Sequence, residues 1–143
     1  MDDLTDDELA FLQRALDLAR GGHTAELAGL VDAGLPVNLT GGSGDSLLML
    51  AAYHDHPDTV QALLDRGADT ARVNDRGQTA LAAAAFRRSE RSVRALLDAG
   101  ADPALGPRSA LDIATFFELD DMLGLLDPQR DDSPTTATPP AVR

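Results

Sequence analysis

The sequence predicts a solenoid of stacked repeats, and two observations support this. The segment LLDRGAD at residues 63–69 returns 33 residues later as LLDAGAD at residues 96–102, and LVDAG at residues 30–34 is a degenerate copy at the same spacing. The glycine of each copy falls at the same place in the period. A repeat of this length is one supersecondary unit that cannot bury its apolar face alone, so the units are expected to stack.

The other half of each period repeats as well. Each copy of this second motif begins with a hydroxyl residue, which small or apolar residues follow. The copies are SLLM from Ser46, TALA from Thr79 and SALD from Ser109. Several linked motifs at one period are far more specific than a single short motif.

The chain resembles ankyrin-repeat proteins over roughly residues 4–126. Their unit has the pattern T-P-L-H-x-A-A-x-x-G-H followed by L-L-x-x-G-A-D. Residues 74–81, NDRGQTAL, match it best, and Gly22-His23 and Asp55-His56 fall where the family places Gly-His. The resemblance implies an all-α ankyrin-repeat solenoid of about four helix-turn-helix units with short β-turn tips.

The first unit is expected to cap the solenoid. Thr5 and Glu8 have the spacing of a capping box, and Leu4 with Leu9 would form a hydrophobic staple. Apolar residues then recur at helical spacing and are expected to face the next repeat: Leu9, Leu12, Leu16 and Ala19. Gly21-Gly22 ends this helix, and the second helix is expected from about Thr24 to Ala33.

The later units are marked by similar signals. Pro57 suits the first turn of the second helix in one unit, and Ser89 can cap the equivalent helix in the next unit. Gly67 and Gly100 end these two helices, because the residue after a helix usually adopts positive φ. The last unit is contracted, with helices expected over about 110–118 and 120–126.

These signals predict an ankyrin-repeat domain over residues 1–127 and a disordered tail over residues 128–143, which has little apolar surface to offset its ordering entropy. The predicted units are 4–37, 38–70, 71–103 and 104–127.

The composition excludes several kinds of chemistry. The chain has 143 residues, enough for one domain of ordinary size. It has no cysteine, which excludes disulfides, thiolate metal sites and thiol catalysis. All 12 basic residues are arginines, which excludes Schiff-base chemistry on lysine.

The net charge of -12 argues against a nucleic-acid partner, because binding phosphates requires clustered basic residues. It favours a neutral or basic protein partner, although solubility explains such a charge equally well. The sequence contains neither a signal peptide nor an apolar stretch of roughly 20 residues, so we expect no membrane association and a cytoplasmic location.

Two segments contain residue types that are found in catalytic or metal sites. Residues 41–45, GGSGD, approach the G-x-S-x-G elbow but fail at Asp45, so a flexible turn tip is the better interpretation. The second segment brings together His54, Asp55, His56 and Asp58. Two histidines separated by one residue at the end of a helix rarely converge on one ion, and no third ligand is spaced to complete a tetrahedral zinc site. The resemblance implies that His54 and His56 lie in the turn between two helices. We therefore expect no catalytic residue, no cofactor and no metal site.

The chain departs from the family pattern at the T-P-L-H motif. Met49, Ala82 and Asp112 stand where the family has histidine, and the proline is also absent. The preceding hydroxyl residues are therefore expected to lose that hydrogen-bond partner, at a cost of about 1 kcal/mol for each bond.

A column of residues near the ends of the first helices is the main candidate site: Arg20, Tyr53, Phe86 and Phe116. The resemblance implies that this position and the next face the concave groove, which gives the set Tyr53, His54, Phe86, Arg87, Phe116 and Phe117. Aromatic and arginine side chains are common binding hot spots. Tyr53 is expected to be the most exposed of them. The alternative is that the rings cover the apolar seam between units.

Two further surfaces are candidates. The resemblance implies that the turn tips contribute to binding, mainly through Asn74, Asp75, Arg76 and Gln78, and secondarily through Leu39, Thr40, Val73, Leu105 and Arg108. An acidic row at the ends of the second helices comprises Asp32, Asp65, Asp98 and Asp127. Aspartate there opposes the helix dipole, and Arg94 is expected to compensate Asp98. A basic partner could bind this row, but a solvated face is the better interpretation.

The sequence thus predicts a monomeric, non-catalytic module that binds a protein partner. The alternative is a dedicated regulatory or inhibitory subunit of one enzyme, which would suppress a specific activity at stoichiometric ratio. An adaptor would bind without altering activity.

Overall fold

The computed structural model describes residues 5–127, and eight α-helices follow one another within that range. They are α1 (Asp6–Gly21), α2 (Thr24–Asp32), α3 (Leu47–Tyr53), α4 (Pro57–Asp65), α5 (Ala80–Phe86), α6 (Glu90–Asp98), α7 (Ala110–Phe116) and α8 (Asp120–Leu126). The all-α prediction is confirmed. The predicted tail lies outside the described residues.

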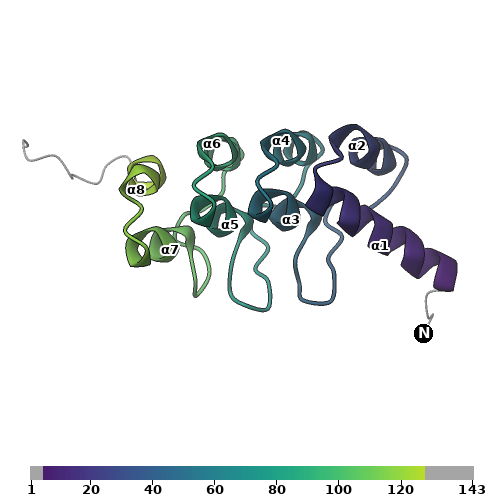
Figure 1. The fold of residues 1–143 in the computed structure, drawn as a ribbon, viewed down its shortest axis with the longest axis horizontal. Coiled ribbons are helices and arrows are strands. Elements are labelled where there is room, and N and C mark those ends of the chain that lie inside the picture. Colours follow the sequence, from purple (N-terminus) through teal and green to yellow (C-terminus); the bar gives the residue numbers. More distant parts are fainter. Residues whose placement is uncertain (1–4, 128–143) are drawn as a thin grey trace, which may run out of the picture.

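The helices form two parallel rows (Figure 1). Helices α2, α4, α6 and α8 make the outer row, while α1, α3, α5 and α7 make the inner row, and the loops project beyond the inner row. Each helix contacts its partner in the pair and the equivalent helix of the next pair. This arrangement is the predicted solenoid, with the loops, inner helices and outer helices as successive layers.

The inner helices begin with the same hydroxyl cap. The side-chain oxygens of Ser46, Thr79 and Ser109 each accept a hydrogen bond from the backbone N–H three residues on, at 3.1 Å. The histidine partner is absent, as expected, and each hydroxyl oxygen instead accepts from the local backbone as a helix cap. The capping box of Thr5 and Glu8 is confirmed.

The turn within each helix pair has one geometry, whichever residue occupies it. Its left-handed position holds Gly22, Asp55, Arg88 and Glu118, at φ values of 72°, 62°, 56° and 54°. In every pair the next residue's N–H donates to the carbonyl oxygen five residues earlier. Stacking with neighbours fixes this turn strongly enough to hold three residues that have a Cβ in a conformation that favours glycine.

The core lies between the two rows and between successive pairs. Equivalent outer-helix positions hold Leu27, Val60 and Val93, all fully buried. On the inner helices, buried alanines such as Ala51 and Ala84 allow neighbouring backbones to pack closely. Fully burying one aliphatic side chain of this size contributes about 1.5–3 kcal/mol, so stacking supplies most of the stability.

The expected burial of Leu9 and the expected ends of two helices need correction. Leu9 is 51% exposed, because the first turns of the 16-residue α1 extend past the end of the stack (Figure 1), while Leu16 and Ala19 are buried as expected. Leu4, its expected staple partner, lies outside the described residues. Helix α7 ends at Phe116, since Phe117 and Glu118 form the turn, and α2 ends at Asp32.

A buried hydroxyl joins the first two outer helices. Thr24 Oγ1 and Thr59 Oγ1 lie 2.6 Å apart, and Thr59 is buried. Ser92 is the equivalent of Thr59 in the next pair, but Pro57 stands where Thr24 would be and has no hydroxyl. The buried Ser92 Oγ therefore has no hydrogen-bond partner among residues 5–127.

We expect different effects on stability when these two hydroxyls are removed. Thr59→Val should lower the free energy of unfolding by about 1 kcal/mol, because a buried hydrogen bond is lost. Ser92→Ala should leave it unchanged or raise it by up to about 1 kcal/mol, because a buried polar atom without a partner is removed. Urea denaturation of both variants measures the difference, and equal destabilisation would contradict the assignment.

Candidate partner-binding surface

Aromatic side chains at the C-terminal ends of the inner helices form a continuous row. Tyr53 ends α3 and Phe86 ends α5, and their rings stack with centroids 6.2 Å apart and planes at 5°. Phe117, the residue after α7, continues the row with its ring centroid 5.5 Å from that of Phe86. His54 packs edge-on against Tyr53 at 5.2 Å.

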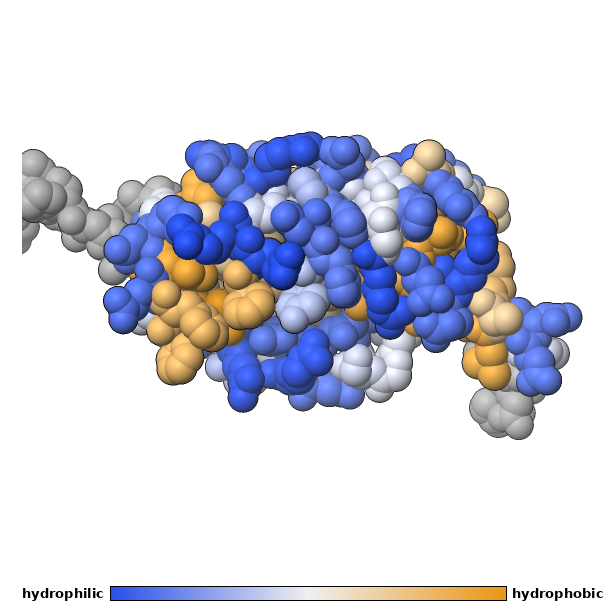
Figure 2. Space-filling model, viewed as in Figure 1, coloured by the Kyte–Doolittle hydropathy of each residue, from blue (hydrophilic) through white to orange (hydrophobic). Residues whose placement is uncertain are grey.

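The row differs from the predicted column at its last member. Phe116 contacts Phe117 at 4.9 Å, and it is 78% exposed, whereas Tyr53 is 45% exposed. The expectation that Tyr53 is the most exposed of the set is therefore wrong. Tyr53 has ring neighbours on two sides, while Phe116 lies at the end of the stack. Figure 2 shows apolar side chains gathered at this end, over α7.

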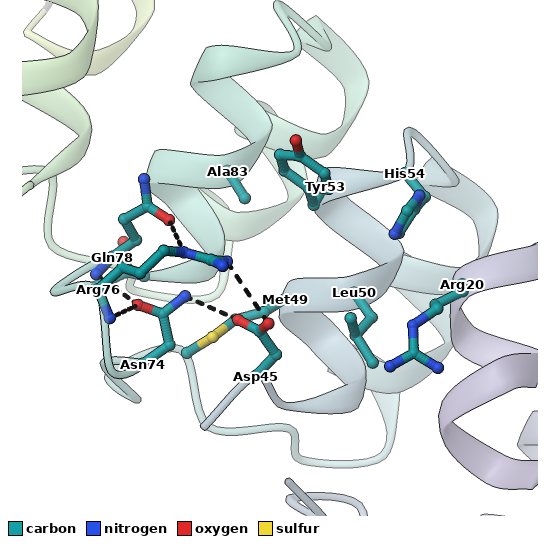
Figure 3. A pocket seen from close by; sticks show the side chains of 11 residues that line it. Arg20, Asp45, Met49, Leu50, Tyr53, His54, Asn74, Arg76, Gln78 and Ala83 are labelled. Atoms are coloured by element: carbon teal, nitrogen blue, oxygen red, sulfur yellow. Dashed lines mark hydrogen bonds and ion pairs between the residues drawn. The ribbon is translucent and has the colours of Figure 1, made fainter. Parts of the chain in front are cut away.

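Three hollows adjoin the row. The first, of about 190 Å³, lies between Tyr53 and the loop residues Arg76 and Gln78 (Figure 3). The second, of about 390 Å³, shares these three residues and continues to Phe117 and Arg108. The third, of about 420 Å³, continues from Arg108 and Phe117 to Phe116.

We call these joined hollows the aromatic groove. One wall consists of the rings of Tyr53, Phe86, Phe117 and Phe116, and the other consists of the loop residues Arg76, Gln78 and Arg108.

Asn74 holds the loop wall in place. Its Oδ1 accepts from the backbone N–H groups of Arg76 and Gln78, both at 2.9 Å, and its Nδ2 donates to Asp45 Oδ1 at 2.7 Å (Figure 3). Asn74 is only 7% exposed. The proposed role of Asn74 as a partner contact is therefore corrected, because its amide is already used within the protein. It positions Arg76 and Gln78.

Asp45 also contributes to this wall, and it was missed among the candidate site residues. It accepts from Asn74 and lies 3.5 Å from Arg76 Nη2 (Figure 3). No local sequence pattern marks it, because its partners come from the next loop. The loops also join through their backbones: Asp75 N–H donates to Ser43 O at 3.1 Å, and Arg108 N–H donates to Gly77 O at 3.0 Å.

The remaining turn-tip candidates differ in exposure. Asp75, Arg76, Val73, Thr40 and Arg108 are exposed, whereas Gln78, Leu39 and Leu105 are half-buried. Around the glycine-rich segment, a β-bridge joins Thr40 to Ser46, and Ser43 Oγ donates to Asp45 Oδ2 at 3.0 Å. This segment is the predicted turn tip.

His54 and His56 lie in the turn between α3 and α4, as predicted. His56 Nε2 donates to the carbonyl oxygen of Arg20 at 2.8 Å, which ties this turn to the preceding pair. Within residues 5–127 no cluster of three or more His, Asp or Glu side chains is arranged to hold a metal ion.

The surroundings of His54 disfavour its charged form. Burial lowers the pKa of His54, and the positive charges of His56, Arg20 and Arg87 lower it further, against a raising effect of Asp45. The pKa of His54 therefore reflects partial burial together with cationic neighbours at this end of the groove.

Two of the four aspartates in the acidic row on the outer helices have side-chain contacts within the described part of the protein. Arg66 binds the carboxylate of Asp32 through Nε at 2.9 Å and Nη2 at 3.1 Å, and this pairing lowers the pKa of Asp32. Asp65 accepts from Gln61. The expected compensation of Asp98 by Arg94 is wrong, because Arg94 pairs with Glu90, one turn earlier, at 2.7 Å.

The fold and groove define a helix-pair solenoid with an open binding surface, and comparison with known proteins identifies the family. Residues 16–106 match the family described as ankyrin repeats in three copies, which covers more than half of the chain. The chain belongs to the ankyrin-repeat family. Within residues 5–127 none of the helices is both long and apolar enough to span a bilayer.

A relative from Pseudomonas aeruginosa, named as an ankyrin repeat protein, is 53% identical over 51 residues. These residues make up 36% of this chain and 30% of the relative. The match thus spans less than a third of the relative's length.

The pKa of His54 is expected to lie below its ordinary value. The pKa of His54 is lower in the folded state than in the unfolded state. The neutral ring therefore contributes its full stabilisation at a pH above the unfolded pKa. This contribution is lost as the pH falls from the unfolded pKa to the folded pKa. An NMR titration of the His54 ring measures this directly. Arg87→Ala should raise the pKa, whereas Arg94→Ala, on the outer face, should not. A wild-type pKa at or above the ordinary value would contradict this account.

Proposed function

We propose that this protein is a non-catalytic module that binds a segment of a partner protein in the aromatic groove. Ankyrin repeats are generally protein–protein interaction modules, and members of the family are typically non-catalytic. The proposal for this chain adds the surface and the residues that make the contact.

The observation that carries the proposal is the continuous row of half-exposed aromatic rings. Tyr53, Phe86 and Phe117 are each 42–48% exposed although they contact one another. Contiguous exposed apolar surface on a monomeric protein marks an interaction site, and burial of aromatic rings dominates the energetics of many interfaces. Packing along the row already restricts the rings, so less of their conformational entropy is lost when a partner binds.

The loop wall supports the same proposal. Asn74 accepts from the backbone N–H groups of Arg76 and Gln78 and donates to Asp45, which holds the loop and leaves the exposed side chain of Arg76 beside the groove. A rigid wall opposite an aromatic wall suits the binding of an extended or helical segment. We propose that the protein acts in this way as a monomer.

Affinity capture from a lysate of the source organism tests the proposal. A triple variant, Tyr53→Ala, Phe86→Ala and Phe117→Ala, should lose partners that the wild type retains, because the apolar contact area is removed. Circular dichroism establishes that the variant is folded. Loss of a hot-spot ring costs 2 kcal/mol or more, which is roughly a 30-fold loss of affinity for each ring.

The matched control changes the acidic row on the outer helices. An Asp65→Asn, Asp98→Asn variant alters two exposed side chains and leaves the groove intact. It should capture the same proteins as the wild type. If the control loses the partner and the aromatic variant retains it, the binding surface is the acidic row and the groove assignment is wrong.

A further inference from the structure

The arginines of this protein divide into two groups. Within residues 5–127 an ion pair joins eight of the ten arginines to a carboxylate. The two without such a pair are Arg87 and Arg108, and both are exposed. Arg87 follows Phe86 at the end of α5, and Arg108 lines the groove with Phe86 and Phe117. Among the described arginines, the two that lack an ion pair therefore lie beside the aromatic row.

The outer face shows the contrasting arrangement. There Arg66, Arg88 and Arg91 bind Asp32, Asp121 and Asp58, respectively, and each pair links one helix pair to another. Those arginines already have carboxylate partners within the protein. Within the described residues, the guanidinium of Arg108 in the groove and that of Arg87, next to Phe86, form no ion pair, so their planar sets of donors are free for a carboxylate from another molecule.

The two carboxylates that line the hollows of the groove, within the described residues, are already engaged. Asp45 accepts from Asn74 and lies near Arg76, and Asp112 forms a capping box with Ser109. The exposed carboxylate of Asp75 lies at the loop tip, and Asp75 is not among the residues that line the groove. At the Tyr53 end, the lowered pKa of His54 reflects burial first and then the cations His56, Arg20 and Arg87. The groove thus provides apolar rings and available positive charge.

We propose that the aromatic groove binds an acidic peptide segment of the partner, with its apolar side chains against Tyr53, Phe86 and Phe117 and its carboxylates on Arg87 and Arg108. This inference rests on the proposed function and adds the chemistry of the partner. It reverses the expectation from the net charge of -12 that a neutral or basic partner is favoured. Exposed charges are largely screened beyond about 8 Å at physiological ionic strength, so the nearest side chains decide the preference of the groove.

Selection from a random peptide library displayed on phage tests this inference. The immobilised wild-type protein should enrich peptides that combine Asp or Glu with large apolar residues. Immobilised Arg87→Glu, Arg108→Glu protein should instead enrich peptides with Lys or Arg, because like charges are disfavoured at close range. Enrichment of peptides without acidic residues on the wild type, or no enrichment at all, would overturn the inference.

Affinities of one synthesised acidic peptide from that selection locate its contacts. Arg87→Ala, Arg108→Ala should weaken binding roughly tenfold, as expected for two exposed charge pairs. The matched control, Arg91→Ala, Arg94→Ala, removes two exposed arginines from the outer face and should leave the affinity unchanged. Equal affinity in the wild type and the groove-arginine variant would overturn the inference.

The aromatic triple variant separates the two proposals. If selected peptides lose affinity on the triple variant but are not acidic, the groove binds peptides and the acidic preference is wrong. If acidic peptides bind the triple variant as well as the wild type, the groove assignment itself fails, and the acidic-peptide inference fails with it.

Discussion

Burial of the apolar face of each helix pair against the next is the interaction on which the rest of this structure depends. Leu27, Val60 and Val93 occupy equivalent positions and are fully buried between neighbours. A single pair of helices of seven to nine residues, such as α3 and α4, has too little apolar surface to fold alone. Stacking therefore determines stability and also brings equivalent surface residues together.

The aromatic groove is a direct product of that stacking. Tyr53 and Phe86 are 33 residues apart in sequence, yet their rings are stacked because they hold the same place in adjacent units. In the contracted last unit, Phe117 rather than Phe116 makes the next ring contact. A row of rings at the surface keeps apolar area available to a partner while each ring is partly supported by its neighbours.

The polar contacts divide between stability and recognition. Ion pairs on the outer face, such as Arg66 with Asp32, link successive units, although exposed pairs typically contribute only about 0–1 kcal/mol each. Asn74 and Asp45 use buried or half-buried polar groups to hold the loop wall. Within the described residues, the side chains of Arg87 and Arg108 form no ion pair. The local charge beside the groove therefore differs in sign from the net charge of the chain.

The sequence by itself determined the repeat, the helix caps and the candidate aromatic residues, because these depend on local backbone chemistry and on a spacing that can be read along the chain. Only the tertiary structure decided that Asn74 is buried, that Phe117 joins the row and that Leu9 is exposed. The choice of ion-pair partners was decided there too, as Arg94 shows by binding Glu90 instead of Asp98. These outcomes depend on contacts between loops and units, and on where the stack ends, which no single repeat contains.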